Sequence, residues 1–465
     1  MSGQIEEYRN NTKLPINLSL TKQLLIDIDQ KSVAPQDLTR AGAHVLDWVA
    51  CASLGADSAA GSAYRALLTL DAGGPCSAIG QTKQLSMQNA ALYNGALGNV
   101  LEMDDIHRSS ILHPGPVVIP AALAAAQQVG CSVGVFLRGV IRGYEVTIRM
   151  GEAIGRSHYA YFHNTATCGA LGAAAATAAI FELSQQQTLW AIGNAGSTTG
   201  GLWQMRNEQV LTKQWHNAEA CRAGLMASFM AKHNLSGPEY ILEGPQGIFA
   251  ALSEDSCPEA FIQTHPSWRI YDCSFKPWPA CRHAHPAMDV LQELMREYGF
   301  SSDEVAHIDV GVYQDAQVFC DRENPQTSLE AKFSIQHGLA AMLLWGAPML
   351  AHYLPEAFSQ AKCSALRGVI RVQVNAEIER RYPARFGASC TVRLKNGTQY
   401  QREHIDTLGD PETPLTEAQR HAKAHMLLSH SGMSEQQIQQ LCQFDWLQSG
   451  NISTFSALMR NQHSE

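Results

Sequence analysis

The sequence lacks several features that define whole classes of protein. Its 465 residues contain no apolar run long enough to cross a membrane, which takes about 20 residues. The richest apolar segment, Cys168 to Leu183, is mostly Ala and Gly. No Lys/Arg-rich run occurs, and the formal net charge is −9. We therefore expect neither a membrane nor a nucleic acid among its partners.

The twelve cysteines also lack a regular arrangement. No CxxC pair occurs, and the ligand spacings of structural zinc sites are missing. In a chain of this size, scattered cysteines are typical of reduced, buried thiols. The first residues, MSGQIEEYRNNTK, do not have the basic and then apolar layout of a secretory signal. These features predict a cytoplasmic protein without a structural metal site.

Three motifs of common enzyme classes are absent as well. The sequence contains no GxGxxG, no GxxxxGK[ST] and no HExxH. It therefore lacks the parts that dinucleotide binding, P-loop phosphate binding and zinc-protease chemistry require.

What is present is an ordinary globular composition, with 45% hydrophobic and 17% charged residues. The length exceeds what one hydrophobic core supports, so we expect at least two domains. Up to about residue 265 the apolar spacing predicts helices, with Pro120 in the first turn of its helix. The predicted helices are Leu24–Leu54, Val117–Gln128, Cys168–Leu183 and Glu219–Lys232.

Strand patterns begin after residue 266. Residues alternate between apolar and polar in Val305–Tyr313 and Val369–Val374, and Asn396-Gly397 marks a hairpin within Cys390–Tyr400. Helical segments lie between and after these strands. The sequence predicts a mainly α fold, with a large all-helical domain formed by both chain ends (1–265 and 406–465) and a smaller α+β domain (266–405). The predicted helices here are Ala284–Tyr298, Ser334–Trp345 and those of Thr416–Glu465.

Two stretches place acidic, imidazole and hydroxyl groups before predicted helices. The first, LEMDDIHRSSILHPG, contains Glu102, Asp105 and His113 at a helix start, where backbone N–H groups favour anions. The second, HYAYFHNTATCG, brings His163 and Thr165 to the start of an Ala/Gly helix. The alternative interpretations are a charged helix cap and a buried core histidine.

Two further stretches gather basic side chains. In TKQWHNA, partial burial of Lys213 would favour the neutral amine, which can act as a base; a solvated lysine is the alternative. KPWPACRHAHP carries Lys276 and Arg282 on a turn that its prolines make rigid, and the planar arginine suits a carboxylate. Because no carboxylate stands at ligand spacing, we do not expect the HAH histidines to bind a metal.

Together these motifs resemble the MmgE/PrpD family over nearly the whole chain. They occur in the order NGALGNVLEMDD…HPG, FHNTATCGALGAAAA, TKQWHNA, KPWPACRHAHPA and AKFSIQHG. The family includes 2-methylcitrate dehydratases, cis-aconitate decarboxylases and an iminodisuccinate epimerase. The resemblance implies a homodimer in which a smaller α+β lid domain accompanies the helical domain. It also implies an active site between the domains that uses no metal and no organic cofactor.

The resemblance further implies roles for single residues. We expect catalytic roles for Lys213, His113, His163 and Glu102. Two positions depart from the relatives: their acidic stretch commonly reads DFDDT, where this chain has Glu102 and Ile106, and cis-aconitate decarboxylases have a lid histidine where it has Cys281. We therefore do not expect decarboxylation of cis-aconitate. The expected substrate-binding residues are Lys276, Arg282, His216, His285 and Asp105.

The predicted reaction starts with removal of a proton beside a carboxylate of a small, anionic di- or tricarboxylic acid. A neutral His or Lys can take the proton, while cationic groups stabilise the charge that develops. Because Ile106 lacks the hydroxyl of the relatives, we favour epimerisation of a dicarboxylate such as iminodisuccinate. Dehydration of a 2-methylcitrate-like acid, with Glu102 or a histidine as the acid, is the first alternative. An inactive carboxylate-binding relative is the second.

Overall fold

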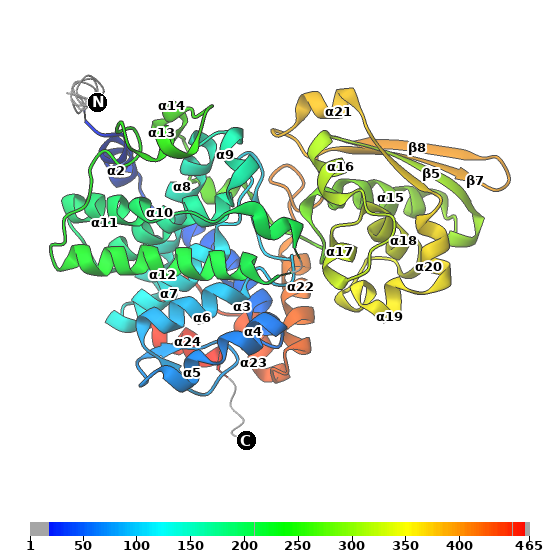
Figure 1. Ribbon diagram of the computed structural model, residues 1–465. Coiled ribbons are helices and arrows are strands. Elements are labelled where there is room, and N and C mark those ends of the chain that lie inside the picture. Colours follow the sequence, from blue (N-terminus) through cyan, green and yellow to red (C-terminus); the bar gives the residue numbers. More distant parts are fainter. Residues whose placement is uncertain (1–17, 209, 449, 461–465) are drawn as a thin grey trace. The chain divides into compact units, whose positions relative to one another are not determined.

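The structure, a computed structural model, describes residues 18–460 apart from 209 and 449. The described chain divides into two compact units, which we call the helical unit (residues 18–100, 104–272 and 420–460) and the mixed unit (101–103 and 273–419). Most described residues are helical and the sheets are small, which confirms the mainly α fold (Figure 1). The first residues of the chain, from which the compartment was predicted, lie outside the described residues.

Helix α10 (Asn164–Ile180) is the core of the helical unit. It packs against α7 (Gly115–Val129), α8 (Val133–Ala153), α11 (Gln185–Ser197) and α12 (Thr212–Lys232). Nearly all of its residues are buried. Its many Ala and Gly residues allow this, because small side chains let neighbouring helix backbones approach closely.

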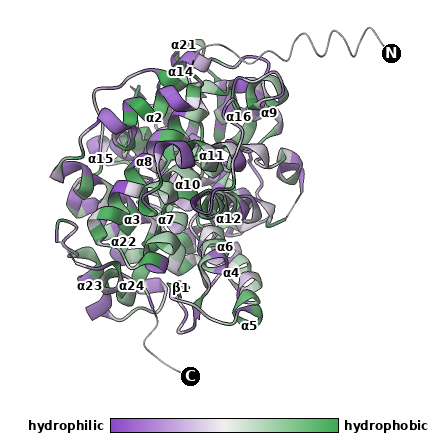
Figure 2. Cartoon of the chain, turned by 90° about the vertical axis from the view of Figure 1, so that its left-hand side faces the viewer, coloured by the Kyte–Doolittle hydropathy of each residue, from purple (hydrophilic) through white to green (hydrophobic). Residues whose placement is uncertain are grey.

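Gly172 of α10 shows how close this approach is. A Cβ atom at this position would lie 1.7 Å from Oγ1 of Thr147 and 2.6 Å from the carbonyl oxygen of Gly143, both on α8. The outer helix α2 (Leu20–Gln30) instead carries hydrophobic and hydrophilic residues together (Figure 2). This is the pattern of amphipathic helices that cover a core.

The predicted segment Leu24–Leu54 forms two helices rather than one. Helix α2 ends at Gln30, and α3 (Pro35–Gly55) begins with a proline. Proline fits the first turn of a helix but cannot continue one, because it has no N–H to donate.

Two further helix boundaries differ from the prediction. Helix α7 begins at Gly115, so Pro120 lies in its second turn, and the first-turn prediction is wrong. Pro116 already occupies the first turn, where a missing N–H costs least. Helix α12 begins at Thr212 instead of Glu219, so Lys213 belongs to its first turn. None of the described helices has the length and apolarity of a membrane span.

The other elements of the helical unit are short. Cys76–Ser77 (β1) and Gln84–Leu85 (β2) form an antiparallel pair. The last predicted segment contains three helices, which begin at residue 417, while residues 461–465 lie outside the described residues. The remaining elements are β3 (Ile106–His107), α4 (Ala59–Tyr64), α5 (Leu67–Leu70), α6 (Met87–Leu97), α9 (Arg156–Tyr161), η1 (Trp203–Asn207), α13 (Ile248–Leu252), α14 (Pro258–Ile262), η2 (Arg269–Asp272), α22 (Glu417–His430), α23 (Glu435–Cys442) and α24 (Ile452–Leu458).

The mixed unit contains a four-stranded sheet in the order β6-β5-β7-β8. Strand β5 (Val305–Val312) runs parallel to β6 (Ile370–Val374) and antiparallel to β7 (Ala388–Leu394), which pairs with β8 (Gln399–His404). The predicted hairpin is confirmed, and its Gly397 has φ +87°.

Alternate residues of β7 are buried, as its alternating sequence predicts, and helix α15 (His285–Tyr298) packs on β7, β8 and α18 (Ile335–Trp345). The other elements of the unit are β4 (Cys273–Ser274), η3 (Arg282–Ala284), η4 (Ser302–Glu304), α16 (Gln314–Cys320), α17 (Ser328–Lys332), η5 (Leu350–Tyr353), α19 (Pro355–Phe358), α20 (Ala361–Arg367) and α21 (Ala376–Arg381).

Candidate active-site residues in the two units

His163 occupies the position directly before α10 in the helical unit. Its backbone N–H donates to the carbonyl of Gly201 at 2.7 Å, which fixes the residue at the helix start. Its ring centroid lies 4.6 Å from that of Trp203 and 5.5 Å from that of His216. The structure therefore brings together two histidines that the sequence predicts for the site.

The electrostatic surroundings keep His163 neutral. Burial lowers its pKa well below the usual range, and the charges of Lys213, His216 and His113 lower it further. Burial also lowers the pKa of His216. A neutral imidazole is the form that can accept a proton.

Several polar atoms in this cluster have no hydrogen-bond partner within the described part of the chain. They are Nδ1 of His163, Nδ1 of His216 and Nε1 of Trp203, and all three atoms are buried. Because buried polar atoms in folded proteins nearly always have partners, these three atoms are available to water or to polar groups of a ligand.

Lys213 lies in the first turn of α12 and is half-buried. His216 follows three residues later, so both side chains project from the same face of the helix. The charge of Lys213 acts on His163, as its effect on the pKa of that ring shows. The first turn of a helix also favours an anion, which suits a carboxylate substrate.

His113 precedes α7, and its backbone N–H donates to Oγ1 of Thr165 at 3.1 Å. Its ring nitrogen Nδ1 lies 2.9 Å from the carbonyl oxygen of Asp105 and 2.9 Å from Oδ2 of Asp104. The charge of His113 acts on His163, so these two predicted catalytic residues share one electrostatic environment.

The carboxylate of Asp105 binds groups of the protein itself. It accepts hydrogen bonds from His44 Nδ1 at 2.7 Å, from the Tyr144 hydroxyl at 2.6 Å and from the Gly115 backbone at 3.0 Å. Although burial acts to raise the pKa of Asp105, these bonds hold it below its usual value. Asp105 thus anchors the start of α7, and its predicted contact with the substrate stays a prediction.

In the mixed unit, Lys276 and Glu102 form a buried ion pair. The Lys276 ammonium donates to the Glu102 carbonyl at 3.1 Å and lies 3.4 Å from its carboxylate oxygen Oε2. Glu102 has a φ of +57°, which costs a residue other than glycine about 1–2 kcal/mol. Strained backbone of this kind clusters at functional sites.

Arg282 and His285 bind partners within their own unit. Arg282 donates to the Asp410 carboxylate and, at 3.0 Å, to the Leu408 carbonyl. His285 Nε2 donates to the Ala280 carbonyl at 3.1 Å, while its Nδ1 lies 3.2 Å from Arg282. These bonds tie residues 280–285 to residues 408–410. The predicted contact of both side chains with the substrate stays a prediction.

The thiol of Cys281 lies beside the Lys276–Glu102 pair. Burial and the charge of Glu102 act to raise its pKa, but a hydrogen bond with the Cys320 thiol and the charge of Lys276 hold it below the ordinary value. The pKa of Cys320 is correspondingly raised, chiefly by burial.

The two histidines of the HAH segment bind different partners. His283 Nδ1 lies 2.7 Å from the Tyr313 hydroxyl, whereas His285 bonds to Ala280.

Within the described residues, one group of three acidic residues has carboxylate oxygens that lie within 4.8 Å of one another. All three carboxylates are paired with arginines, Asp410 with Arg282, and both Asp406 and Glu412 with Arg385. The group is Asp406, Asp410 and Glu412.

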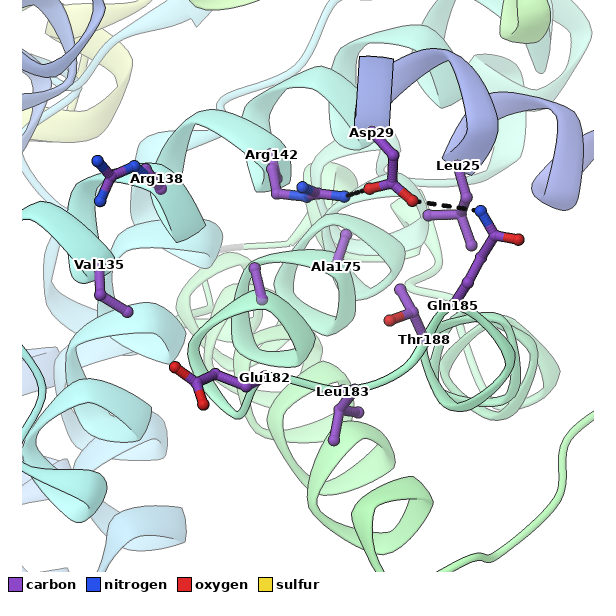
Figure 3. A pocket seen from close by; sticks show the side chains of 11 residues that line it. Leu25, Asp29, Val135, Arg138, Arg142, Ala175, Glu182, Leu183, Gln185 and Thr188 are labelled. Carbon is purple, nitrogen blue, oxygen red and sulfur yellow. Dashed lines mark hydrogen bonds and ion pairs between the residues drawn. The ribbon is translucent and has the colours of Figure 1, made fainter. Parts of the chain in front are cut away.

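A surface pocket of about 280 Å³ in the helical unit contains none of the predicted site residues (Figure 3). Asp29 in this pocket binds both Arg142 and Gln185. Because none of the predicted site residues lines it, the pocket does not carry the predicted chemistry.

One serine-hydrolase-like pattern, GxSxG, occurs at residues 130–134. Ser132 is the N-cap of α8, and its hydroxyl accepts a hydrogen bond from the Val135 backbone. The serine therefore begins a helix in the way expected of a cap.

Comparison with known families covers most of the chain. The sequence profile of the MmgE/PrpD N-terminal domain matches residues 23–260, and that of the MmgE/PrpD C-terminal domain matches residues 278–447. The chain belongs to the MmgE/PrpD family.

Three relatives illustrate the range of reactions in the MmgE/PrpD family. The chain is 26% identical to the cis-aconitate decarboxylase-like protein oryM of Aspergillus oryzae over 350 residues, 70% of this chain and 72% of the relative. It is 26% identical to human cis-aconitate decarboxylase over 353 residues, 70% of each chain. It is 23% identical to the mitochondrial 2-methylcitrate dehydratase of Yarrowia lipolytica over 273 residues, 56% of this chain and 52% of the relative.

In this MmgE/PrpD protein, two residues that contact predicted site residues, and one that supports them, were not predicted from the sequence. Asp104 lies against His113, Asn99 binds Asp104, and Trp203 lies against His163. Asp104 stood among several acidic residues, and the sequence did not indicate which of them would face a histidine. Asn99 and Trp203 gave no signal of their own.

Proposed function

We propose that this protein is a lyase that removes a proton from a carbon beside a carboxylate and then expels a hydroxyl group as water. Its substrate is a small di- or tricarboxylic hydroxy acid of the 2-methylcitrate type. The observation that carries the proposal is the buried, neutral ring of His163, whose Nδ1 has no partner within the described part of the chain.

In this proposal His163 is the base. The positive charge of Lys213 nearby stabilises the negative charge that develops on the substrate carboxylate when the proton leaves. The bound anion also offsets the effect of Lys213 on His163, which makes the ring a better proton acceptor than in the empty enzyme. Lys213, which the sequence suggested as a base, thus becomes the electrostatic partner.

His113, protonated on both ring nitrogens when the anionic substrate is bound, gives the proton on Nε2 to the leaving hydroxyl and returns to the neutral ring with its proton on Nδ1. Its Nδ1 is bonded within the protein, so Nε2 is the nitrogen that remains for the substrate. In the mixed unit, Lys276 is the proposed ligand of a second carboxylate, and Glu102 holds the ammonium group of Lys276 in place.

The names of the relatives, decarboxylase and dehydratase, support a lyase over an isomerase.

Epimerisation of a dicarboxylate such as iminodisuccinate is the second candidate. It requires two bases, one for each face of the carbon, and the pair His113 and His163 offers two imidazoles in one electrostatic environment. In that case both rings exchange protons with the substrate and no water is lost.

The test is to incubate the purified enzyme in deuterated water with 2-methylcitrate, citrate or single stereoisomers of iminodisuccinate. A lyase produces a rising absorbance from the new carbon–carbon double bond. An epimerase incorporates deuterium beside the carboxylate without forming the alkene. If neither change occurs with any of these acids, the protein is a carboxylate-binding relative and the proposal fails.

Two substitutions connect the activity to the site. We expect His163→Gln and Lys213→Ala each to lower kcat by about 100-fold or more, because each removes a group that acts in the transition state. Lys232→Ala is the matched control, because Lys232 is an exposed lysine at the other end of α12. This control is expected to keep wild-type kcat, and circular dichroism verifies that all three variants fold.

A further inference from the structure

We propose that Asp104 is the positioning residue of His113. It holds the ring in the tautomer that carries its proton on Nδ1 and so presents Nε2 to the substrate. The catalytic part of this inference rests on the proposed function, whereas the tautomer of the ring is a property of the free protein.

The two oxygens of the Asp104 carboxylate have different partners. Oδ1 accepts a hydrogen bond from Nδ2 of Asn99 at 2.7 Å. Oδ2 lies 2.9 Å from His113 Nδ1 in an ion-pair contact, and within the described part of the chain it has no hydrogen-bond partner. The side chain is buried, with an exposure of 1%. A buried carboxylate oxygen is costly unless a donor faces it, so the Nδ1 proton of His113 is the group that stabilises it.

The second neighbour of Nδ1 points to the same tautomer. The carbonyl oxygen of Asp105 lies 2.9 Å from this nitrogen and is an acceptor only. Two acceptors against one ring nitrogen require a proton there, since a bare nitrogen would face two negative oxygens. In the neutral ring, Nε2 then carries the lone pair.

The neighbouring aspartate shows that this arrangement is specific to one position. The carboxylate of Asp105 is saturated by His44, Tyr144 and the backbone of Gly115. Asp104 has one oxygen left for His113. Of these two adjacent acids, Asp104 is therefore the one whose carboxylate faces a predicted catalytic side chain.

The other charged groups around Asp104 leave the region negative. Lys423 binds Asp47 at 2.6 Å, and the charge of Asp104 acts on both of them. Three carboxylates, those of Asp47, Asp104 and Asp105, thus face two cationic side chains, Lys423 and Arg40, because His44 is neutral and Arg40 acts on it. On the other side, Lys213 and His113 both act on the His163 ring. The excess negative charge on the Nδ1 side favours a proton at this nitrogen.

The substitution Asp104→Asn tests this arrangement sharply. Nδ2 of Asn99 donates to the Oδ1 position, so the amide oxygen of the new side chain is expected to stay there. The amide NH2 group then faces His113 Nδ1 and replaces an acceptor with a donor. This favours the tautomer with the proton on Nε2, as carboxylate-to-amide changes beside catalytic histidines do in serine proteases.

The tautomer is measured directly by 15N NMR of histidine-labelled protein at a pH where the ring is neutral, with His113 assigned by comparison with His113→Gln. We expect the Nδ1–H form in the wild type and a shift toward the Nε2–H form in Asp104→Asn. We also expect kcat to fall by about tenfold to 100-fold, with KM changed far less and with an altered pH profile.

Asp71→Asn is the control, because Asp71 is a buried aspartate of the same unit that binds Ser86 and Asn89 instead of a histidine. It is expected to leave the tautomer of His113 and kcat unchanged. Asn99→Ala serves as a second variant if Asp104→Asn does not fold. It frees Oδ1 of Asp104 and is expected to weaken, in the same direction, the preference for Nδ1–H.

The inference is overturned if His113 has the Nε2–H form in the wild type, or if its tautomer is the same in the wild type and both variants. If instead the tautomer changes as expected but the wild type turns over none of the acids, the proposed function fails and the placement of Asp104 stands.

Discussion

At the scale of the residue, neighbouring side chains of like charge serve different partners. Asp104 faces His113, and Asp105 binds His44 and Tyr144. In the mixed unit, Lys276 binds Glu102 and Arg282 binds Asp410, so the two basic groups of the KPWPACR segment differ in the same way. What each charge does is therefore decided by the atom it faces.

The anchoring role of Asp105 leads to a prediction about stability. Asp105→Ala removes the buried acceptor of three hydrogen bonds, which come from His44 Nδ1, the Tyr144 hydroxyl and the Gly115 backbone. We expect the free energy of unfolding to fall by about 3 kcal/mol or more. Urea unfolding followed by circular dichroism measures this loss. Wild-type stability, with activity lost, would show that Asp105 acts mainly on the substrate.

At the scale of the element, the contact between α8 and α10 depends on glycine. We expect Gly172→Ala to lower the free energy of unfolding by about 1–3 kcal/mol, because the new methyl group overlaps Thr147 and the backbone of α8. A thermal melt measures the change.

Gly134→Ala on α8 is the matched control for this contact. A Cβ atom at Gly134 would lie 3.5 Å from its closest neighbour, a terminal nitrogen of Arg138, which is ordinary contact. Because alanine is the better helix former, the control is expected to be neutral or stabilising. Equal melting temperatures for the two variants would contradict the close helix contact.

The start of α12 is a second feature at this scale. The helix begins at Thr212, and this places Lys213 and His216 on neighbouring turns of one face. The Gly200-Gly201 pair lies before it, and a Cβ atom on Gly201 would lie 3.2 Å from His216 Nδ1. Backbone without a side chain at Gly201 thus lets α12 bring its histidine against the start of α10.

At the scale of the whole molecule, buried histidines predict how stability depends on pH. Burial lowers the pKa of His44, His107, His158 and His337 from 6.5 to about 4. Between these two values the unfolded chain binds more protons than the folded one, so the free energy of unfolding falls as the pH falls. Asp47, whose pKa is raised to about 6 mainly by burial, opposes this, but it is one group against four.

We therefore expect the free energy of unfolding to drop by on the order of several kcal/mol between about pH 7 and about pH 5. Urea unfolding at the two pH values measures the change. A stability that stays constant or rises toward pH 5 would show that the four rings are charged in the folded protein.

The homodimer implied by the family resemblance remains a proposal, which exposed apolar side chains of the helical unit support. Leu211 and Trp215 lie one turn apart at the start of α12 and are 50% and 53% exposed. We expect light scattering to give the mass of a dimer and Trp215→Glu to shift it toward the monomer. Leu70→Glu, at an exposed position of α5, is the control that should leave the mass unchanged. A monomeric wild type would contradict the proposal.

Much of the fold followed from local patterns in the sequence. The hairpin at Asn396-Gly397 was predictable because few residue pairs adopt that turn, and the helices around the Ala/Gly segment were predictable from apolar spacing. The break between α2 and α3 and the early start of α12 were missed, because helix ends depend on caps and single contacts more than on periodicity.

The sequence by itself determined the mainly α fold, the family and the set of His, Lys and Asp residues gathered in a few motifs. Only the tertiary structure decided which of these groups face each other, such as Asp104 and His113, or His163 and His216. The physical reason is the separation along the chain over which each kind of interaction acts. Helix and turn preferences act between residues a few positions apart, whereas the pairing of charges and the burial that shifts a pKa depend on residues that folding brings together from distant segments.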